Sequence, residues 1–381
     1  MPEQIVLQAT ESGLPASVAE MAARHLGARR EHVVITTLAG DASTRRYFRM
    51  RHGQGYDFQA AGDSQACDET VIVSLYPAPF DETEPARNRL ARLTGSDPSA
   101  RLIFANDPCA HIEVTALFLK AGLPVPRVVS VWGMEGALLF EDVGDARLQD
   151  WVASRPAGEY CPAYRHALDL VVRIQEGTRR CGPDSICSAL AFDEGKLKWE
   201  LDFFFRHYFR HHLQANLDSE TIDRIEEDFA AICRELGAMP RVLVHRDYHA
   251  RNLMMRNGTM YIIDHQDARM GPESYDVVSL LRDPYTGLKD SMIEELAEYF
   301  VEAKAASAVP LIDPKNWPAA FHLMTIQRTL KAAGTYAYQS AVMNNPVYRP
   351  YLEPAISSAV SSMRSLGRFK HLRSALENGA N

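Results

Sequence analysis

One stretch of the chain, residues 243–276, constrains the fold more than any other. A short apolar run leads into a His-Arg-Asp triplet that ends at Asp247, and four residues separate this aspartate from Asn252. An Asn-Gly pair at 257–258 then joins the segment to a second apolar run, which is followed by Asp264. An Asn-Gly pair between two apolar runs is a strong signal for a tight β-hairpin. The pattern therefore predicts that the Asp247 loop and Asp264 lie side by side.

The residue types at this spacing suit phosphoryl transfer from a nucleoside triphosphate. That reaction asks the protein to orient and deprotonate an acceptor hydroxyl and to hold magnesium through oxygen ligands. We predict that Asp247 is the catalytic base and that Asn252 and Asp264 bind Mg²⁺, which takes few protein ligands. Each residue alone also has a structural explanation, because an aspartate before a turn commonly caps or forms that turn. The complete set favours a phosphotransferase site.

The composition is that of an ordinary globular protein, and it limits the kinds of partner. The 381 residues are 46% hydrophobic and 24% charged, with a formal net charge of −8. This charge disfavours general binding to nucleic acid or to anionic membranes, and no segment reaches the ~18 consecutive apolar residues of a membrane span. The first residues lack a signal-peptide pattern, and the six cysteines form no C-x-x-C pair. We expect a cytoplasmic protein with reduced thiols, and nothing in the sequence implies a protein partner.

Hydrophobic periodicity predicts an α+β fold of two lobes, with an antiparallel sheet in the N-lobe and a mainly helical C-lobe. Strands are expected within 32–50 on either side of a turn, and at 70–76, 128–131 and 137–140. Helices are expected at 14–28, 111–121, 165–175, 197–213, 221–236, 291–307, 318–339 and 354–366. The proline-containing residues 77–100 are expected to be irregular and the last eight residues to be frayed. These elements place the N-lobe at 1–140, a hinge at 141–144 and the C-lobe at 145–381.

The first predicted hairpin is the candidate cover for the triphosphate. Its turn contains Gly40, Asp41 and Ser43, and small residues there let the backbone approach phosphate groups. A plain hairpin turn explains the same residues, so the central motif is what makes the nucleotide-binding interpretation the favoured one.

The N-lobe has an unusual shortage of lysine. The strand at 70–76 has no basic residue, and the one lysine among the first 150 residues, Lys120, lies in a predicted helix. Arg45 and Arg46 follow the hairpin turn and are the candidate cations for the phosphates. Strand alternation places them on opposite faces, so we expect one of them to face the nucleotide. A solvated position at a sheet edge is the alternative for both.

The central segment resembles the aminoglycoside phosphotransferase branch of the protein-kinase-like fold. It reads HRDYHARNLM at 245–254 and IIDHQDARMGPESYD at 262–276. Further segments resemble the bacterial cell-wall amino-sugar kinases: GDASTRRYFR at 40–49, LLFEDVGDARLQDWV at 138–152, KWELDFFFRHYF at 198–209, YDVVSLLRDPY at 275–285 and QRTLKAAGTY at 327–336. The resemblance implies ATP-dependent phosphorylation of the anomeric hydroxyl of N-acetylmuramate and/or N-acetylglucosamine. The sugar 1-phosphate formed would serve peptidoglycan recycling.

The resemblance also implies roles for individual residues. It implies that Asp247 is the catalytic base and that Asn252 and Asp264 bind Mg²⁺. Glu141 and Asp142 would form the adenine-binding hinge, largely through their backbone. The family also lacks the N-lobe lysine, so its absence here does not indicate an inactive enzyme.

The residues that bind the acceptor are harder to identify. Asp267 and Arg282 are the candidates, and a structural salt bridge explains each of them equally well. His265 stands where the family commonly has an aromatic residue such as phenylalanine. We predict that Asp276 is structural, capping a helix and bracing the catalytic loop.

Three other functions remain open. A protein kinase needs a long activation segment, and only eleven residues separate Asp264 from Asp276, so a small acceptor is favoured. An aminoglycoside or another small-molecule hydroxyl is an alternative acceptor, and polycationic aminoglycosides call for an acidic pocket. A nucleotide-binding pseudokinase would keep the fold without turnover, but all three residues of the central motif are present. The sequence does not distinguish between the two amino sugars.

Overall fold

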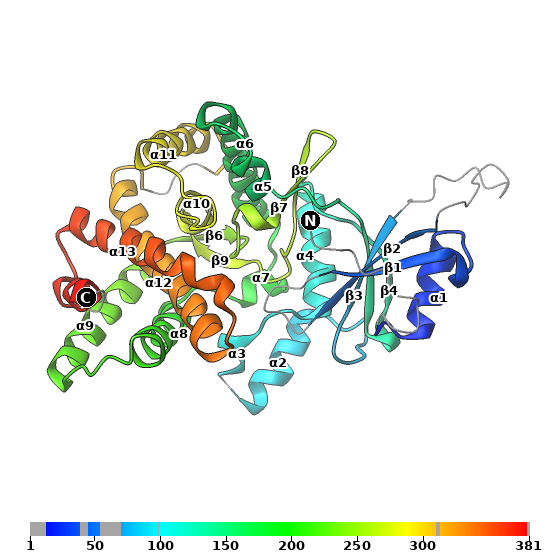
Figure 1. The fold of residues 1–381 in the computed structure, drawn as a ribbon, viewed down its shortest axis with the longest axis horizontal. Coiled ribbons are helices and arrows are strands. Elements are labelled where there is room, and N and C mark those ends of the chain that lie inside the picture. The colour runs from blue at the N-terminus through cyan, green and yellow to red at the C-terminus, as the bar shows by residue number, and fades with distance from the viewer. Residues whose placement is uncertain (1–12, 39–44, 54–69, 98, 310–312, 379–381) are drawn as a thin grey trace.

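A computed structural model describes residues 13–38, 45–53, 70–97, 99–309 and 313–378. A five-stranded sheet lies at one end of the molecule and a helical body at the other (Figure 1). The sheet is antiparallel throughout, in the order β1-β2-β3-β5-β4. Its strands are β1 Val33–Leu38, β2 Arg46–His52, β3 Thr70–Leu75, β4 Val128–Trp132 and β5 Ala137–Glu141. The predicted strands and their pairing are confirmed.

The two faces of the sheet pack against different helices. Phe48 of β2 and Leu139 of β5 are buried in a small core with α1 (Ala16–His25). Leu138 and Phe140 point the other way, into the main core that contains α4 (Pro108–Lys120). This alternation is what a strand period of two requires.

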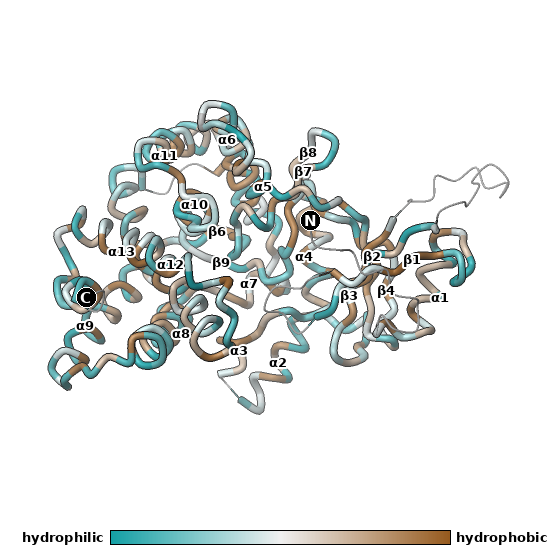
Figure 2. The backbone as a smooth tube through the Cα atoms, viewed as in Figure 1, coloured by the Kyte–Doolittle hydropathy of each residue, from teal (hydrophilic) through white to brown (hydrophobic). Residues whose placement is uncertain are grey.

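The helical body is built on amphipathic helices around α12. The outer helices α9 and α11 alternate between hydrophilic and hydrophobic residues along their length (Figure 2). The helices are α5 Leu148–Ala153, α6 Ala157–Glu176, α7 Ile186–Ala189, α8 Glu194–Phe204, α9 Ser219–Ala238, α10 Tyr275–Leu281, α11 Asp290–Ala305, α12 Trp317–Ala337, α13 Leu352–Leu366 and α14 Lys370–Asn378. Among the described residues, no helix is long and apolar enough to cross a lipid bilayer.

Two short strand pairs and several short 3₁₀- and π-helical segments lie between the elements named so far. β6 (Arg241–Val244) pairs with β9 (Arg269–Pro272), and β7 (Leu253–Arg256) pairs with β8 (Thr259–Ile262). The 3₁₀-helical segments are η1 Arg30–His32, η2 Gly133–Glu135, η3 Gly177–Arg180, η5 Ala250–Asn252 and η7 Pro346–Tyr351. The π-helical segments are η4 Phe205–His212 and η6 Tyr338–Val342. The predicted helix at 197–213 is α8 followed by η4, in which the helix widens to π-helical geometry.

Two expectations were wrong. Residues 77–100 are not irregular throughout, because α2 (Ala86–Ser96) forms there. Pro85 occupies its N-cap position, where the fixed φ of proline is compatible with helix entry, so the prolines flank the helix rather than break it. The C-terminal residues are not frayed as a whole, because α14 continues to Asn378 with Leu372 and Leu376 buried against the main core.

Candidate active site

The catalytic loop, residues 245–252, follows β6 and is held by a buried carboxylate. Asp276 accepts hydrogen bonds from the backbone N–H groups of His245 (2.6 Å) and Arg246 (3.1 Å). Arg246 has a φ of +87°, a left-handed conformation that this bracing stabilises. The predicted bracing role of Asp276 is confirmed. The predicted helix cap is not, because Ser274 occupies the N-cap position of α10 and Asp276 lies in its first turn.

Asp247 lies on this loop among three basic side chains. Its Oδ1 is 3.2 Å from the Lys331 Nζ and 3.4 Å from an Arg328 guanidinium nitrogen, both from α12. Its Oδ2 is 3.6 Å from the Nε of Arg246. Burial opposes ionisation, but these cations, Lys331 foremost, outweigh it and hold the pKa of Asp247 well below its ordinary value. The carboxylate is therefore ionised and available as a hydrogen-bond acceptor.

The β7–β8 hairpin brings Asn252 and Asp264 next to this carboxylate. Its turn residues, Asn257 and Gly258, both have positive φ (51° and 78°), as a type I′ turn requires. Ile263 N–H donates to the carbonyl of Asn252 (3.0 Å), so the residue before Asp264 is bonded directly to the predicted metal ligand. The Asn252 side-chain N–H donates to the Asp247 carbonyl (2.9 Å), which leaves its amide oxygen for another partner. The predicted hairpin and the proximity of these residues are confirmed.

Arg45 reaches Asp264 from the sheet. Its guanidinium is 2.9 Å from the Asp264 Oδ1, which also accepts a hydrogen bond from Gln266 (2.9 Å). Burial opposes ionisation of Asp264, and Arg45 with Gln266 outweighs that effect and lowers its pKa. Arg46 is exposed and points to the opposite face, where its guanidinium lies over the Phe48 ring. Of the two candidate arginines, only Arg45 faces the site. Gly40, Asp41 and Ser43 lie outside the described residues.

The predicted hinge residues use their side chains within the protein. Glu141, at the end of β5, pairs with Arg127 (3.1 Å). Asp142 is buried and pairs with Arg49 (2.6 Å), while its carbonyl accepts a hydrogen bond from Arg256. These contacts fix the connection between β5 and the helical body. Two backbone groups also have partners here, since the Glu141 N–H donates to the Arg127 carbonyl (3.0 Å) and the Asp142 carbonyl accepts from Arg256, so the adenine-binding role of this segment stays a prediction.

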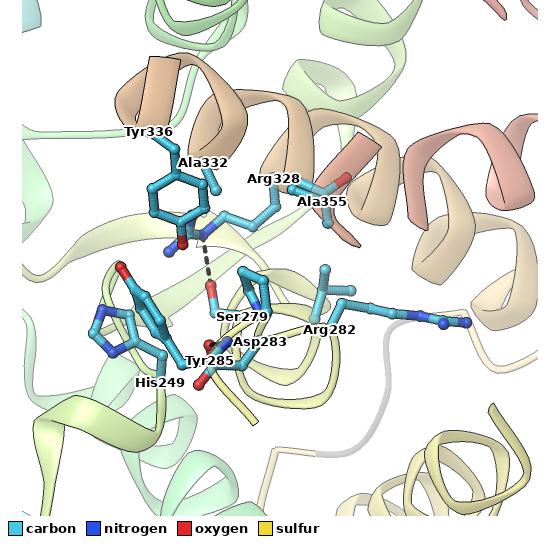
Figure 3. A pocket seen from close by; sticks show the side chains of 12 residues that line it. His249, Ser279, Arg282, Asp283, Tyr285, Arg328, Ala332, Tyr336 and Ala355 are labelled. Carbon is cyan, nitrogen blue, oxygen red and sulfur yellow. Dashed lines mark hydrogen bonds between the residues drawn. The ribbon is translucent and has the colours of Figure 1, made fainter. Parts of the chain in front are cut away.

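The two acceptor candidates lie in different surroundings. Asp267 is buried beside the catalytic loop, where it pairs with Arg246 (2.9 Å) and accepts from the backbone N–H of Asn106 (2.9 Å). Arg282 pairs with Asp290 (2.6 Å). In Figure 3 its guanidinium extends away from His249 and the neighbouring tyrosines. Only Asp267 is in contact with the catalytic loop.

A small cavity lies behind the loop and shows what sequence reasoning missed. It has a volume of about 20 Å³ and is lined in part by His249, Tyr285 and Arg328 (Figure 3). Arg328 donates to the Ser279 hydroxyl (2.7 Å), and this bond holds its guanidinium near Asp247. Arg328 and Lys331 were not predicted as site residues. Their signal was a pair of basic residues three positions apart in a helix that has no other Lys, Arg, Asp or Glu.

Comparisons with known proteins agree with this arrangement. The sequence model of a phosphotransferase enzyme family matches residues 34–308. The chain belongs to this phosphotransferase enzyme family. It is 27% identical over 346 residues to the N-acetylmuramate/N-acetylglucosamine kinase of Pseudomonas aeruginosa, with 90% of this chain and 88% of that protein covered. It is 24% identical to the protein of the same name from Neisseria meningitidis serogroup B, with 83% and 81% covered.

Solved structures support the fold. The chain superimposes on an ADP-bound aminoglycoside phosphotransferase with a TM-score of 0.55 and 12% identity, covering 91% of this chain and 99% of that one. A choline kinase from Cryptosporidium parvum gives a TM-score of 0.55 and 11% identity, covering 94% and 99%. This family member therefore has the protein-kinase-like fold, with an antiparallel sheet at one end and a mainly helical remainder.

Proposed function

We propose that this protein transfers the γ-phosphoryl group of ATP to the anomeric hydroxyl of an N-acetyl amino sugar, N-acetylmuramate and/or N-acetylglucosamine. The observation that carries the reaction type is the ionised Asp247 with Asn252 and Asp264 beside it. The names of the relatives support the choice of acceptor. In this proposal residues 1–140 form the N-lobe, 141–144 the hinge and 145–381 the C-lobe.

Asp247 is the proposed base. Its carboxylate accepts a hydrogen bond from the anomeric hydroxyl and takes the proton as the new oxygen–phosphorus bond forms. A carboxylate with a low pKa is a weak base. Its main contribution is therefore to orient the hydroxyl oxygen toward phosphorus.

The donor set between the lobes fits magnesium. Asn252 offers an amide oxygen, and Asp264 offers a carboxylate whose side chain is 39% exposed while Oδ1 is occupied by Arg45 and Gln266. The proposed protein ligands are these two side chains, and in the described parts of the chain no group of three or more His, Cys, Asp or Glu side chains gathers into a metal site. That is the usual arrangement for Mg²⁺, which would neutralise charge on the phosphate oxygens when bound.

The proposed nucleotide contacts come from the sheet and the hinge. Arg45, held beside Asp264, supplies the positive charge that a lysine gives in other kinases. Gly40, Asp41 and Ser43 would cover the triphosphate, and the backbone at Glu141 and Asp142 would meet the base. For the acceptor we retain Asp267, since Arg282 extends away from the site.

The test is an ADP-release assay with ATP and Mg²⁺ against N-acetylmuramate, N-acetylglucosamine, glucose, galactose and kanamycin, with phosphorus NMR of the product. We expect an anomeric phosphate on an N-acetyl sugar and none on glucose or galactose. Turnover of kanamycin alone would replace the sugar with an aminoglycoside. Tight ATP binding without turnover of any acceptor would identify a pseudokinase.

A further inference from the structure

Three basic side chains contact Asp247 and two more lie near those three, so that five come together from four different segments. We call them the cationic cluster: Lys196 of α8, Arg246 of the catalytic loop, Arg269 of β9, and Arg328 and Lys331 of α12. The whole chain has a net charge of −8, so this local excess of positive charge runs against the composition. The phosphotransferase chemistry described above uses only Asp247 from this region.

Arg328 and Lys331 are incompletely neutralised. Both approach the same oxygen, Oδ1 of Asp247, at 3.4 and 3.2 Å. Charge-assisted hydrogen bonds between nitrogen and oxygen are typically about 2.7–2.9 Å long. The two cations share one oxygen of Asp247, and both distances are longer than this typical length. Both cations can therefore bind a second anionic partner.

The rest of the cationic cluster adds to this surplus. Arg269 is only 1% exposed, and in the described chain its hydrogen bonds go to the carbonyl oxygens of Asp267 and Phe104. Burial and the nearby Arg246 lower its pKa to about 10, so it keeps its charge at neutral pH. The cluster therefore contains a buried guanidinium that contacts no carboxylate of the described residues.

The neighbouring acids do not remove the excess. Glu200 pairs with Lys196 (3.6 Å), and Asp267 pairs with Arg246 (2.9 Å). Burial lowers the pKa of Lys196 to about 7, and burial raises the pKa of Asp276, near Arg328, to about 7. At neutral pH Lys196 and Asp276 are therefore each only partly charged, which removes part of one positive and part of one negative charge. Arg269 and the Arg328–Lys331 pair remain underneutralised.

We propose that Lys331 and Arg328, with the cationic cluster behind them, bind a carboxylate on the acceptor sugar. This inference rests on the proposed function and deepens it, because only one of the two sugars carries such a group. N-acetylmuramate has a lactyl ether that ends in a carboxylate, and N-acetylglucosamine has a neutral hydroxyl there. The site is thus built for N-acetylmuramate and for acidic amino sugars in general.

Two features favour the acceptor over the transferring phosphoryl group as the anion. The nucleotide side has its own cation, since Arg45 stands next to Asp264. Lys331 and Arg246 are the most accessible members of the cationic cluster, with 17% and 16% of their side chains exposed against 9% for Arg328. Of the two, Lys331 has no carboxylate partner at less than 3.0 Å among the described residues, whereas Arg246 pairs with Asp267 at 2.9 Å.

The first experiment changes the substrate and leaves the protein intact. Steady-state kcat/KM is measured for N-acetylmuramate, for its neutral carboxamide and for N-acetylglucosamine. We expect the acid to exceed the carboxamide by at least about tenfold, mainly through KM, because one charge-assisted contact is lost. Equal values for the acid and the carboxamide would overturn the inference. Absence of turnover with all three would overturn the proposed function itself.

The second experiment locates the contact. Because Lys331 also touches Asp247, Lys331→Met is expected to slow both sugars, so the readout is the ratio of kcat/KM for N-acetylmuramate to that for N-acetylglucosamine. That ratio should fall at least about tenfold, and Lys331→Arg should restore most of it. Lys198→Met, which removes a charge from the far side of α8 where Lys198 pairs with Asp202 and Glu226, should leave the ratio unchanged. An equal loss for both sugars would assign Lys331 to the phosphoryl group and overturn the carboxylate contact.

Discussion

Asp247 is an ionised, partly exposed carboxylate that contacts three basic side chains. Asp247→Asn keeps the shape of the side chain while removing the proton acceptor and the negative charge that faces Arg246, Arg328 and Lys331. We expect kcat to fall by roughly 10²–10⁴, the usual range for loss of a general base, with ATP binding by calorimetry within about threefold of wild type. Turnover near the wild-type rate would remove Asp247 from this role.

His265 gives a residue-scale prediction about stability and pH. It is buried, stacks on Phe118 and contacts the Thr115 hydroxyl (2.7 Å), and burial lowers its pKa to about 3. Unfolded chains bind this proton near pH 6.5, so between pH 6.5 and 3 the unfolded state holds more protons and stability is lost as pH falls. His265→Phe removes this dependence.

The measurement is the free energy of unfolding by denaturant at pH 6, 5 and 4. In wild type each buried neutral histidine contributes a slope of about 1.4 kcal/mol per pH unit, and the variant should lose about that much slope. His371→Gln, at an exposed position on α14, is the control and should keep the wild-type slope. An unchanged slope in His265→Phe would show that this histidine is protonated in the folded protein.

At the scale of elements, α4 depends on its N-cap residue, Asp107. Asp107 accepts hydrogen bonds from the N–H groups of Cys109 and Ala110 (3.0 Å each) and pairs with Arg89 (2.7 Å). Asp107→Ala should lower the free energy of unfolding by about 1–2 kcal/mol from the lost cap, with a further loss from the unpaired arginine. Asp107→Asn keeps a capping oxygen and should cost clearly less. Thermal and denaturant unfolding measure both variants. If Asp107→Ala and Asp107→Asn lose the same free energy of unfolding, the ion pair with Arg89 and not the cap stabilises this helix.

The elements that the sequence predicted are those whose signal is local. The β7–β8 hairpin follows from its Asn-Gly turn, and the sheet follows from alternating apolar residues. α2 was missed because four prolines within 77–100 outweighed a weak helical pattern, although they flank the helix. α14 was missed because its stability comes from burial against distant segments, which periodicity over so few residues does not reveal.

The residues of the site show the same difference between local sequence signals and contacts made by distant segments. Asp247, Asn252 and Asp264 could be predicted because their spacing along the chain encodes their chemistry. The contributions of Arg328 and Lys331 could not, because more than eighty residues of sequence separate Asp247 from Lys331 and only tertiary packing brings α12 to the loop. The choice between Arg45 and Arg46 also needed the structure, since strand alternation gives opposite faces without saying which one is covered by α1.

At the scale of the whole molecule, Arg45 connects the sheet to the helical body through Asp264. Arg45→Met removes a cation from the proposed phosphate site and leaves Asp264 with Gln266 as its remaining side-chain partner. Wild type at an ATP·Mg²⁺ concentration one hundred times its Kd should gain about 2.7 kcal/mol of stability, since the ligand binds only the folded state. In Arg45→Met we expect most of this gain to disappear at the same concentration, and kcat/KM for ATP to fall by at least about tenfold.

Arg46→Met is the matched control, one residue away on the opposite face, and should respond to ATP as wild type does in thermal unfolding and in turnover. Equal behaviour of the two variants would mean that the phosphates are held without an N-lobe arginine. Nucleotide binding would then be coupled to the junction between sheet and helices through the β5 hinge alone.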